Sequence, residues 1–302
     1  MFFGYSYFLI LNYVGGDQAS YRALYEALSI TKFLDVPFVA EKYIIASDWL
    51  SFYLLWMGAV LGINKDIYIA LANTLMLLFL CLSARKSGVN YPMIALLMCN
   101  YYVIVLMTSA ERLKFAFIFL FLAVLVRQKK WKILFYLLSV FAHLQSLILL
   151  ASVALNYYKS IIWKLLRGGL WKKGVFSAVG AVVLGGAFFY IKLDSIEAKF
   201  KSYSDYGAFV EVLQIAVFML AGLFFIKNKF GFFVSLLVLI IAAFLVGGHR
   251  VNMIAVFFGV YLFWIERKGN HPFLYVVMIY FAIKSMPFVL NILNYGNGFH
   301  EF

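Results

Sequence analysis

The stretch Thr108-Ser-Ala-Glu-Arg-Leu-Lys-Phe-Ala-Phe117 places three charged side chains where one long apolar run meets the next. Those residues are Glu111, Arg112 and Lys114. Charged groups at or inside a membrane are costly, so they tend to face a cavity and to carry function. A polar loop whose long side chains snorkel to the interface is the simpler interpretation, and this stretch alone supports both equally. The rest of the chain has to decide between them.

The composition of the chain is that of an integral membrane protein. Of its 302 residues, 65% are hydrophobic and 13% are charged, and the mean hydropathy is +0.93. A soluble domain is usually about 45–50% apolar and about 25% charged. A helix needs about 20 residues to cross the hydrocarbon layer, so the length allows about ten spans with short loops. We therefore predict an all-α, polytopic helical bundle of about ten transmembrane helices, forming a single integral membrane domain over residues 1–302.

The charged and reactive residues exclude several classes of protein. The net charge is +13, but Lys and Arg gather in short loops, where they act as topology signals, so we expect no nucleic-acid partner. Four His and two Cys are scattered without the spacing of zinc ligands, which predicts no metal site. The chain has neither a P-loop nor a Gly-x-Gly-x-x-Gly sequence, so it lacks the signs of ATP-driven transport and of dinucleotide chemistry. No cofactor is expected.

The early part of the chain is more polar than the rest, and we predict an outer loop with amphipathic helices over residues 15–65. Four apolar positions share one helical face by their spacing of three and four: Tyr21, Leu24, Tyr25 and Leu28. Asp17 stands just ahead of them and is suited to cap that helix. Residues 41–62 are apolar but interrupted by Glu41, Lys42, Ser47 and Asp48, which predicts a segment that either lies in the membrane interface or enters the membrane only part way.

Cleaner spans follow, and the basic loops between them set the topology. We predict these spans at residues 66–84, 91–107, 113–126 and 273–293. The cluster Arg127-Gln-Lys-Lys-Trp-Lys132 is the strongest cytoplasmic marker in the chain. With this cluster inside, residues 15–65 and the junction at Glu111 fall on the outer, periplasmic side. A second periplasmic loop is predicted at residues 192–206.

One segment does not fit a simple alternation of inside and outside. Residues 133–158 join the basic cluster that ends at Lys132 to a second basic stretch at residues 159–173. Either the segment forms a re-entrant hairpin that turns near His143 and Gln145, or the second basic stretch is periplasmic. The hairpin is slightly favoured.

On this topology, polar residues from distant segments gather on the outer face. They are Asp17 with Arg22, Glu111 with Arg112, and His249 with Arg250, and His143 joins them from its apolar run. A planar guanidinium suits bidentate capture of phosphate, and two such groups can hold a diphosphate leaving group. A nearby carboxylate or imidazole can remove the proton from an incoming hydroxyl. Each residue also has a structural interpretation, which is a helix cap, a surface ion pair, a snorkelling arginine or a hydrogen-bonded histidine.

Short motifs along the chain resemble, in order, those of a known family. They are Gly15-Gly16-Asp17-Gln-Ala-Ser-Tyr21, the helix rich in Ala and Phe that opens at Arg112, Phe141-Ala-His143-Leu-Gln-Ser146, and the run from Arg250 to Trp264. Together they look like the EpsG-like, Wzy-type polymerases of O-antigen and exopolysaccharide. The chain departs from that family at the first motif, where Gly-Thr-Asp-Tyr is usual.

This resemblance implies a fold similar to the GT-C glycosyltransferases and an enzyme of lipopolysaccharide biosynthesis. Such an enzyme lies in the bacterial inner (cytoplasmic) membrane, with its active site facing the periplasm. It transfers a growing glycan from undecaprenyl pyrophosphate to the sugar of an incoming undecaprenyl-linked repeat unit, without a metal. The implied partners are these lipid-linked oligosaccharides, the bilayer, a chain-length regulator and a flippase. The pyrophosphate would be held by Arg112 and Arg250, with Arg22 as a further candidate, and the acceptor would be met by Asp17, Glu111, His143 or His249.

Two other functions fit the sequence less well. A transporter or flippase for a lipid-linked sugar or a small solute favours paired repeats and helices broken near the midplane, and the chain has no convincing repeat. A membrane acyltransferase needs a histidine beside a carboxylate or an arginine in an early helix, and the first histidine of the chain is His143.

Overall fold

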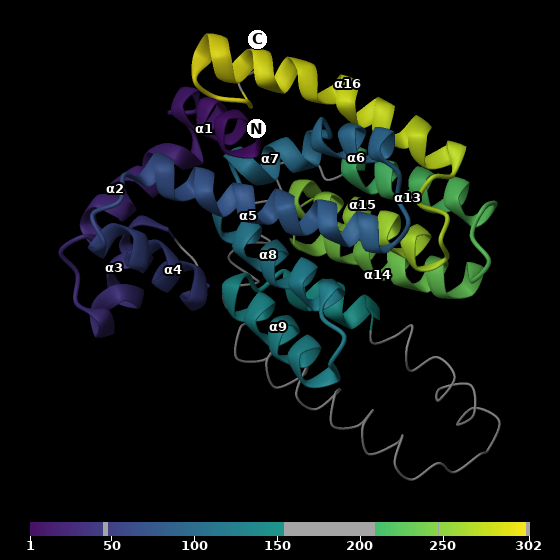
Figure 1. The fold of residues 1–302 in the computed structure, drawn as a ribbon, viewed down its shortest axis with the longest axis horizontal. Coiled ribbons are helices and arrows are strands. Elements are labelled where there is room, and N and C mark those ends of the chain that lie inside the picture. Colours follow the sequence, from purple (N-terminus) through teal and green to yellow (C-terminus); the bar gives the residue numbers. More distant parts are fainter. Residues whose placement is uncertain (45–47, 154–208, 247, 300–302) are drawn as a thin grey trace. The chain divides into compact units, whose positions relative to one another are not determined.

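The computed structural model describes residues 1–44, 48–153, 209–246 and 248–299, and within these ranges helices are the only regular elements (Figure 1). The all-α prediction is confirmed for these residues. The helices are α1 (Phe2–Asn12), α2 (Asp17–Leu28), the short 3₁₀ helix η1 (Phe33–Asp35), α3 (Val36–Tyr43), α4 (Trp49–Val60), α5 (Lys65–Lys86), α6 (Tyr91–Met98), α7 (Tyr101–Thr108), α8 (Glu111–Leu125), α9 (Lys129–Ala142), α13 (Phe209–Leu223), α14 (Lys229–Val246), α15 (Gly248–Ile265) and α16 (Pro272–Tyr295).

The chain divides into two compact units. The first unit comprises Met1–Ser146 and Arg267–Phe302, and the second unit comprises Leu147–Glu266. The predicted outer loop at 192–206 and the basic stretch at 159–173 lie outside the described residues. The two alternatives for the preceding segment therefore stay open, and the single membrane domain and the periplasmic placement of the early loop stay predictions.

Two helices of the described residues, α5 and α16, are long and apolar enough to cross a membrane. The pair α6 and α7 is a third candidate, and it is bent by 49° at a short break. Shorter apolar helices accompany them, namely α1, α4, α13 and the greater part of α14 and of α15. This set is compatible with a membrane protein. The number of about ten spans is not confirmed by the part of the chain that the structure describes.

Helix α5 forms the core of the first unit, and its ends are fixed by local sequence. The Asn64 side chain caps its start by accepting a hydrogen bond of 2.9 Å from the backbone N–H of Asp66. Arg85 and Lys86 occupy its last turn, where cations interact favourably with the helix dipole. The Lys86 ammonium also donates to two carbonyl oxygens at the end of α8, both at 2.8 Å. Helix α8 therefore lies beside α5, and it packs against α9 on another side.

Helices α2, α3 and α4 gather at one end of α5 (Figure 1). The apolar face predicted for α2 is the buried one, and it carries Tyr21, Leu24, Tyr25 and Leu28. Gly58 of α4 permits the close packing at this end, because a Cβ atom there would lie 2.5 Å from the Tyr25 hydroxyl and 2.7 Å from the Tyr68 ring. The amphipathic region thus packs as an ordered helical layer against the start of α5.

The start of α2 differs from the prediction. The residue at the N-cap is Gly16, and its φ of +57° lies in the left-handed region that glycine tolerates. Asp17 is the first helical residue and therefore does not occupy the N-cap position. Its carboxylate still suits this position, because an acidic group in the first turn interacts favourably with the helix dipole.

The two chain segments of the first unit are joined by backbone hydrogen bonds between distant loops. The amides of Val14 and Gly15 both donate to the carbonyl oxygen of Gly296, at 3.0 and 2.8 Å. Gly296 ends α16 in the left-handed conformation, with a φ of +68°. The Tyr13 hydroxyl adds a hydrogen bond of 3.3 Å to the side chain of Asn297. We name this arrangement the terminal clasp.

In the second unit, helices α13, α14 and α15 pack against one another. Their shared core contains Phe218, Phe232 and Phe263, whose rings meet edge to face in two pairs. Gly222 and Gly259 make room for these rings, because a Cβ atom at either position would overlap the ring of Phe232 or of Phe218. Close packing in this unit therefore depends on large aromatic side chains set against small residues.

Candidate functional site

The three charged residues at the start of α8 are buried inside the first unit. Glu111 and Lys114 have no exposed surface, and Arg112 is 6% exposed. The interpretation of this stretch as a solvated polar loop is therefore wrong. A buried charge has to be paired or hydrogen-bonded, so each of the three needs a partner.

Arg112 finds its partners in two segments that precede it by many residues. Its Nη1 lies 2.5 Å from the Oδ2 of Asp48, and its Nε donates to the Tyr21 hydroxyl at 2.9 Å. Asp48 is itself buried, immediately before α4. Asp48 therefore balances the charge of Arg112, and the two contacts hold its guanidinium in one orientation. The Nη2 of Arg112 has no hydrogen-bond partner among the described residues.

The same carboxylate holds His143 at the end of α9. The Nδ1 of His143 lies 2.8 Å from the Oδ2 of Asp48, and its Nε2 lies 3.0 Å from the Oε1 of Gln145. The second oxygen of Asp48 accepts a hydrogen bond of 3.1 Å from the backbone amide of Leu144. We name the group of Asp48, Arg112 and His143 the Asp48 centre. It forms where the start of α4, the start of α8 and the turn after α9 converge.

Electrostatics keep Asp48 ionised. Burial alone would raise the pKa of Asp48, but His143, Arg112 and the backbone amide of Leu144 outweigh burial and hold that pKa well below its usual range. An ionised Asp48 favours a proton on the Nδ1 of His143. The other ring nitrogen is then the one that can exchange a proton with a ligand.

A second set of buried polar groups surrounds Glu111. The ammonium of Lys65 lies 2.9 Å from the Oε1 of Glu111 and donates to the side-chain oxygen of Gln18 at 2.6 Å. The amide nitrogen of Gln18 donates in turn to the carbonyl oxygen of Thr108. We name Gln18, Lys65 and Glu111 the Lys65 cluster. The other carboxylate oxygen of Glu111 is buried and has no hydrogen-bond partner in the part of the chain that the structure describes.

Lys114 is the third buried charge of the stretch. Its ammonium donates to the carbonyl oxygen of Met107 at 2.8 Å, and Asn73 donates to the same oxygen at 2.9 Å. Lys114 is not within ion-pair distance of a carboxylate among the described residues. The region contains five buried ionisable side chains, which are Asp48, Lys65, Glu111, Arg112 and Lys114. Lys65, Arg112 and Lys114 bring three basic side chains to one region, and this set suits an anionic ligand.

Arg22, a predicted ligand of pyrophosphate, serves mainly to hold the first unit together. Its Nη1 lies 2.9 Å from the Oδ2 of Asp66, and its Nη2 donates to the carbonyl oxygens of Ile10 and Tyr13 at 3.2 and 3.4 Å. The carboxylate of Asp17 is near enough for its charge to act on Arg112. Of the predicted residues in the first unit, Arg112 and His143 meet directly at Asp48, and Glu111 and Asp17 lie around them.

The remaining two predicted residues belong to the second unit. Arg250 is half-buried in the first turn of α15, and His249 precedes it, with a side chain outside the described part of the structure. The start of this helix packs against α13, since a Cβ atom on Gly248 would lie 2.7 Å from the Cβ of Glu211. A site shared by Arg112 and Arg250 therefore stays a prediction.

Sequence reasoning missed several members of the site, above all Asp48, Lys65, Gln18 and Tyr21. Asp48 is the centre of the arrangement, yet in the sequence it only interrupts an apolar segment. That interruption was the available signal, because an ionisable residue in such a run is a candidate functional residue with a partner. Lys65 and Gln18 carry no comparable signal, since both lie at the polar ends of helices.

Comparison of the chain with protein-family models, with curated proteins and with solved structures finds no match. The function therefore has to be argued from the site itself.

Proposed function

We propose that this protein is a glycosyltransferase of the polysaccharide-polymerase type in the bacterial inner membrane. It transfers a growing glycan from undecaprenyl pyrophosphate to a hydroxyl of an incoming lipid-linked repeat unit on the periplasmic side. The observation that carries the proposal is the Asp48 centre, in which one buried carboxylate holds both a histidine and an arginine. These are the groups that such a transfer needs in the absence of a metal.

In the proposed reaction, His143 is the general base. Asp48 keeps the proton on the Nδ1 of His143, so the Nε2 accepts the proton of the acceptor hydroxyl. The Gln145 amide lies 3.0 Å from that nitrogen and occupies the place that the hydroxyl takes on binding, with the amide turned so that its NH2 group donates to the unprotonated Nε2. The acceptor oxygen then bonds to the anomeric carbon of the donor sugar. The bond from that carbon to the pyrophosphate oxygen breaks in the same step.

The leaving pyrophosphate takes up the electron pair of the broken bond, and cations stabilise the charge that develops on it. Arg112 is directed by Asp48 and Tyr21, and its Nη2 remains available for a phosphate oxygen. Lys65 and Lys114 are two further buried basic side chains of the same region, and they support the same role. Arg250 is the proposed second ligand of the pyrophosphate.

The proposal is tested by extension of purified lipid-linked repeat units in vesicles that contain the full chain. His143→Gln is expected to lower the rate of extension by about 10²–10⁴-fold, because it removes the general base. Arg112→Lys is expected to impair extension, because a lysine cannot reproduce the planar fork held by Asp48 and Tyr21. Matched controls are His271→Gln and Arg127→Lys, which lie away from the Asp48 centre. If the folded His143→Gln variant extends the glycan at the normal rate, His143 is not the general base.

A second candidate function is transport of a lipid-linked sugar or a small solute. The observation that favours it is the break between α6 and α7, because transporters build their sites at discontinuous helices. Vesicle assays distinguish the two functions. Movement of a labelled lipid-linked sugar across the bilayer without any lengthening of the glycan would support transport. Lengthening without movement supports the polymerase.

A further inference from the structure

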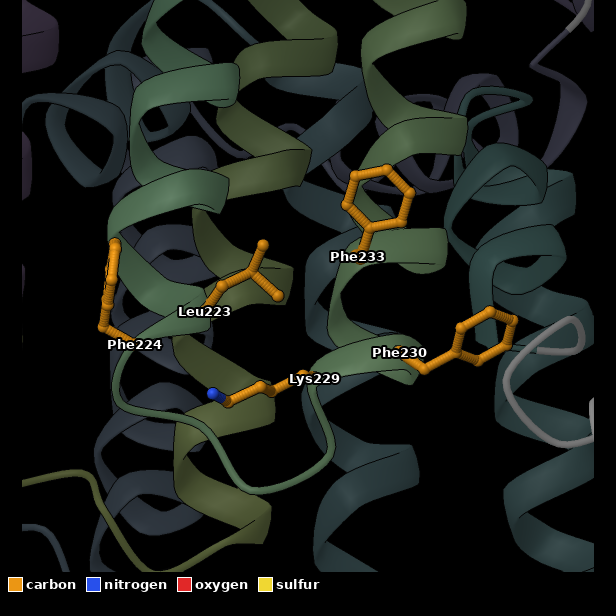
Figure 2. Close-up of a pocket in the computed structure, with 5 residues that line it drawn as sticks. All are labelled: Leu223, Phe224, Lys229, Phe230 and Phe233. Atoms are coloured by element: carbon orange, nitrogen blue, oxygen red, sulfur yellow. The ribbon is translucent and has the colours of Figure 1, made fainter.

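The second unit contains an open pocket at the turn between α13 and α14. Its volume is about 310 Å³, and it is lined by Leu223, Phe224, Lys229, Phe230 and Phe233 (Figure 2). Leu223 and Phe224 come from the end of α13, and the other three come from the first turns of α14. All but one of the lining side chains are apolar. The exception is Lys229, which extends from the start of α14 toward the end of α13 in Figure 2.

The apolar wall of the pocket is exposed and is not part of the protein core. Phe224 is 80% exposed and Phe230 is 52% exposed, whereas Phe232, between the lining residues of α14, is buried. Phe232 fills the space above Gly222 and thereby fixes α13 and α14 together. The pocket is therefore formed on a closely packed pair of helices. Clustered exposed aromatic residues of this kind indicate contact with a membrane or another ligand.

The positive charge of Lys229 is not neutralised by the neighbouring acidic residue. The carboxylate of Glu266 accepts hydrogen bonds of 2.7 and 2.9 Å from the backbone amides of Lys227 and Asn228. Both of its oxygens are thus used to hold the turn. Lys229 has no partner among the described residues. It also stands at the start of α14, where the helix dipole adds to the positive potential.

We infer that this pocket binds an anionic phospholipid of the bilayer. The phosphate of the headgroup lies at Lys229 and the first turn of α14, and the upper part of an acyl chain lies against Phe224 and Phe233. An unpaired cation beside an exposed aromatic wall fits both ends of this ligand. The inference concerns the second unit alone and does not rest on the proposed transferase activity.

Binding is tested on the full chain, purified in detergent, by thermal unfolding with added lipid. Phosphatidylglycerol is expected to raise the midpoint of unfolding more than phosphatidylcholine does, and inorganic phosphate is expected to have no effect. This comparison needs no variant. Equal stabilisation by the two lipids would overturn the inference, and so would stabilisation by inorganic phosphate alone.

Two pairs of variants then locate the site. Lys229→Gln is expected to weaken the apparent affinity for phosphatidylglycerol about fivefold, while Lys227→Gln leaves it unchanged. Phe224→Ser is expected to weaken it as well, while Phe244→Ser, at another highly exposed position near the far end of α14, leaves it unchanged. All four side chains are exposed, so none of these changes disturbs the core. Equal effects within either pair would show diffuse attraction to the surface and would overturn the inference.

Discussion

The carboxylate of Asp48 lies 2.5 Å from the guanidinium of Arg112, although the two residues are 64 positions apart in the chain. The same oxygen lies 2.8 Å from the Nδ1 of His143. One side chain therefore holds the start of α4, the start of α8 and the end of α9 in one arrangement. Any change at Asp48 acts on both of its partners.

The stability of the protein is expected to depend on the ionisation of Asp48 at acidic pH. The pKa of Asp48 is lowered in the folded protein by His143 and Arg112, against the effect of burial. Ionised Asp48 therefore makes its full contribution to the free energy of unfolding above the unfolded pKa of about 3.9. That contribution is lost as the pH falls toward the pKa of the folded protein. Asp48→Asn leaves Arg112 without its counter-charge and is expected to cost about 3–5 kcal/mol at neutral pH.

Thermal unfolding between pH 7 and pH 3 measures this dependence. The difference in midpoint between the wild type and Asp48→Asn is expected to narrow below about pH 4, because Asp48 then binds a proton in the unfolded state while it stays ionised in the folded state. Asp35→Asn is the matched control, since Asp35 is an exposed residue of η1. A difference that stays constant down to pH 3 would contradict the role of Asp48 as a buried anion.

The ion pair between Lys65 and Glu111 is expected to behave as a coupled buried pair. Lys65→Met leaves the carboxylate of Glu111 buried without a counter-charge, and Glu111→Leu leaves the ammonium of Lys65 in the same state, at a cost of about 3–5 kcal/mol each. The double variant removes both charges. The decrease in its free energy of unfolding is expected to be smaller than the sum of the two single decreases by at least about 2 kcal/mol.

Unfolding in detergent of the wild type, the two single variants and the double variant measures this coupling. Lys42→Met and Glu26→Leu serve as controls at exposed positions, and we expect no measurable coupling between them. Additive losses at Lys65 and Glu111 would mean that the two side chains do not depend on each other for their charge.

Gly58→Ala is expected to destabilise the first unit by about 1–3 kcal/mol, because a Cβ atom there overlaps two tyrosines. The Tyr25 hydroxyl would lie 2.5 Å from it and the Tyr68 ring 2.7 Å. Gly4→Ala in α1 is the matched control, since its Cβ atom would meet no other atom within 4 Å. We expect that change to be neutral or to stabilise by about 0.5–1 kcal/mol. Equal thermal midpoints for the two variants would contradict the tight packing of α4.

Much of the fold follows from the sequence, because it depends on patterns along one helix. The apolar runs at 66–84 and 273–293 correspond to α5 and α16, and the periodic face of α2 is buried as predicted. The run at 91–107 differs, since Asn100 breaks it into α6 and α7. Its side chain accepts a hydrogen bond of 2.8 Å from the amide of Tyr102 and so starts a new helix. An N-cap residue inside an apolar run was a local signal for that break.

The site was predictable only in part, because its contacts join distant segments. The functional candidates Arg112 and His143 do meet, but they meet through Asp48. The sequence suggested instead a simple pair of Glu111 with Arg112. Adjacent residues on a helix point in different directions, so Glu111 turns to Lys65 while Arg112 turns to Asp48. Which partner a buried charge selects depends on the packing of whole helices, and no local pattern encodes that choice.

The terminal clasp has a consequence for how the protein is made. Val14 and Gly15 donate to Gly296, so the loop after α1 is secured by a residue that is translated only after the whole second unit. The surfaces of α1, α6 and α7 that α16 covers have no partner from within the first unit until the whole second unit has been translated. During synthesis, lipid or an insertion factor has to cover them. A chain that stops before α16 therefore lacks the closing element of the unit that holds the Asp48 centre.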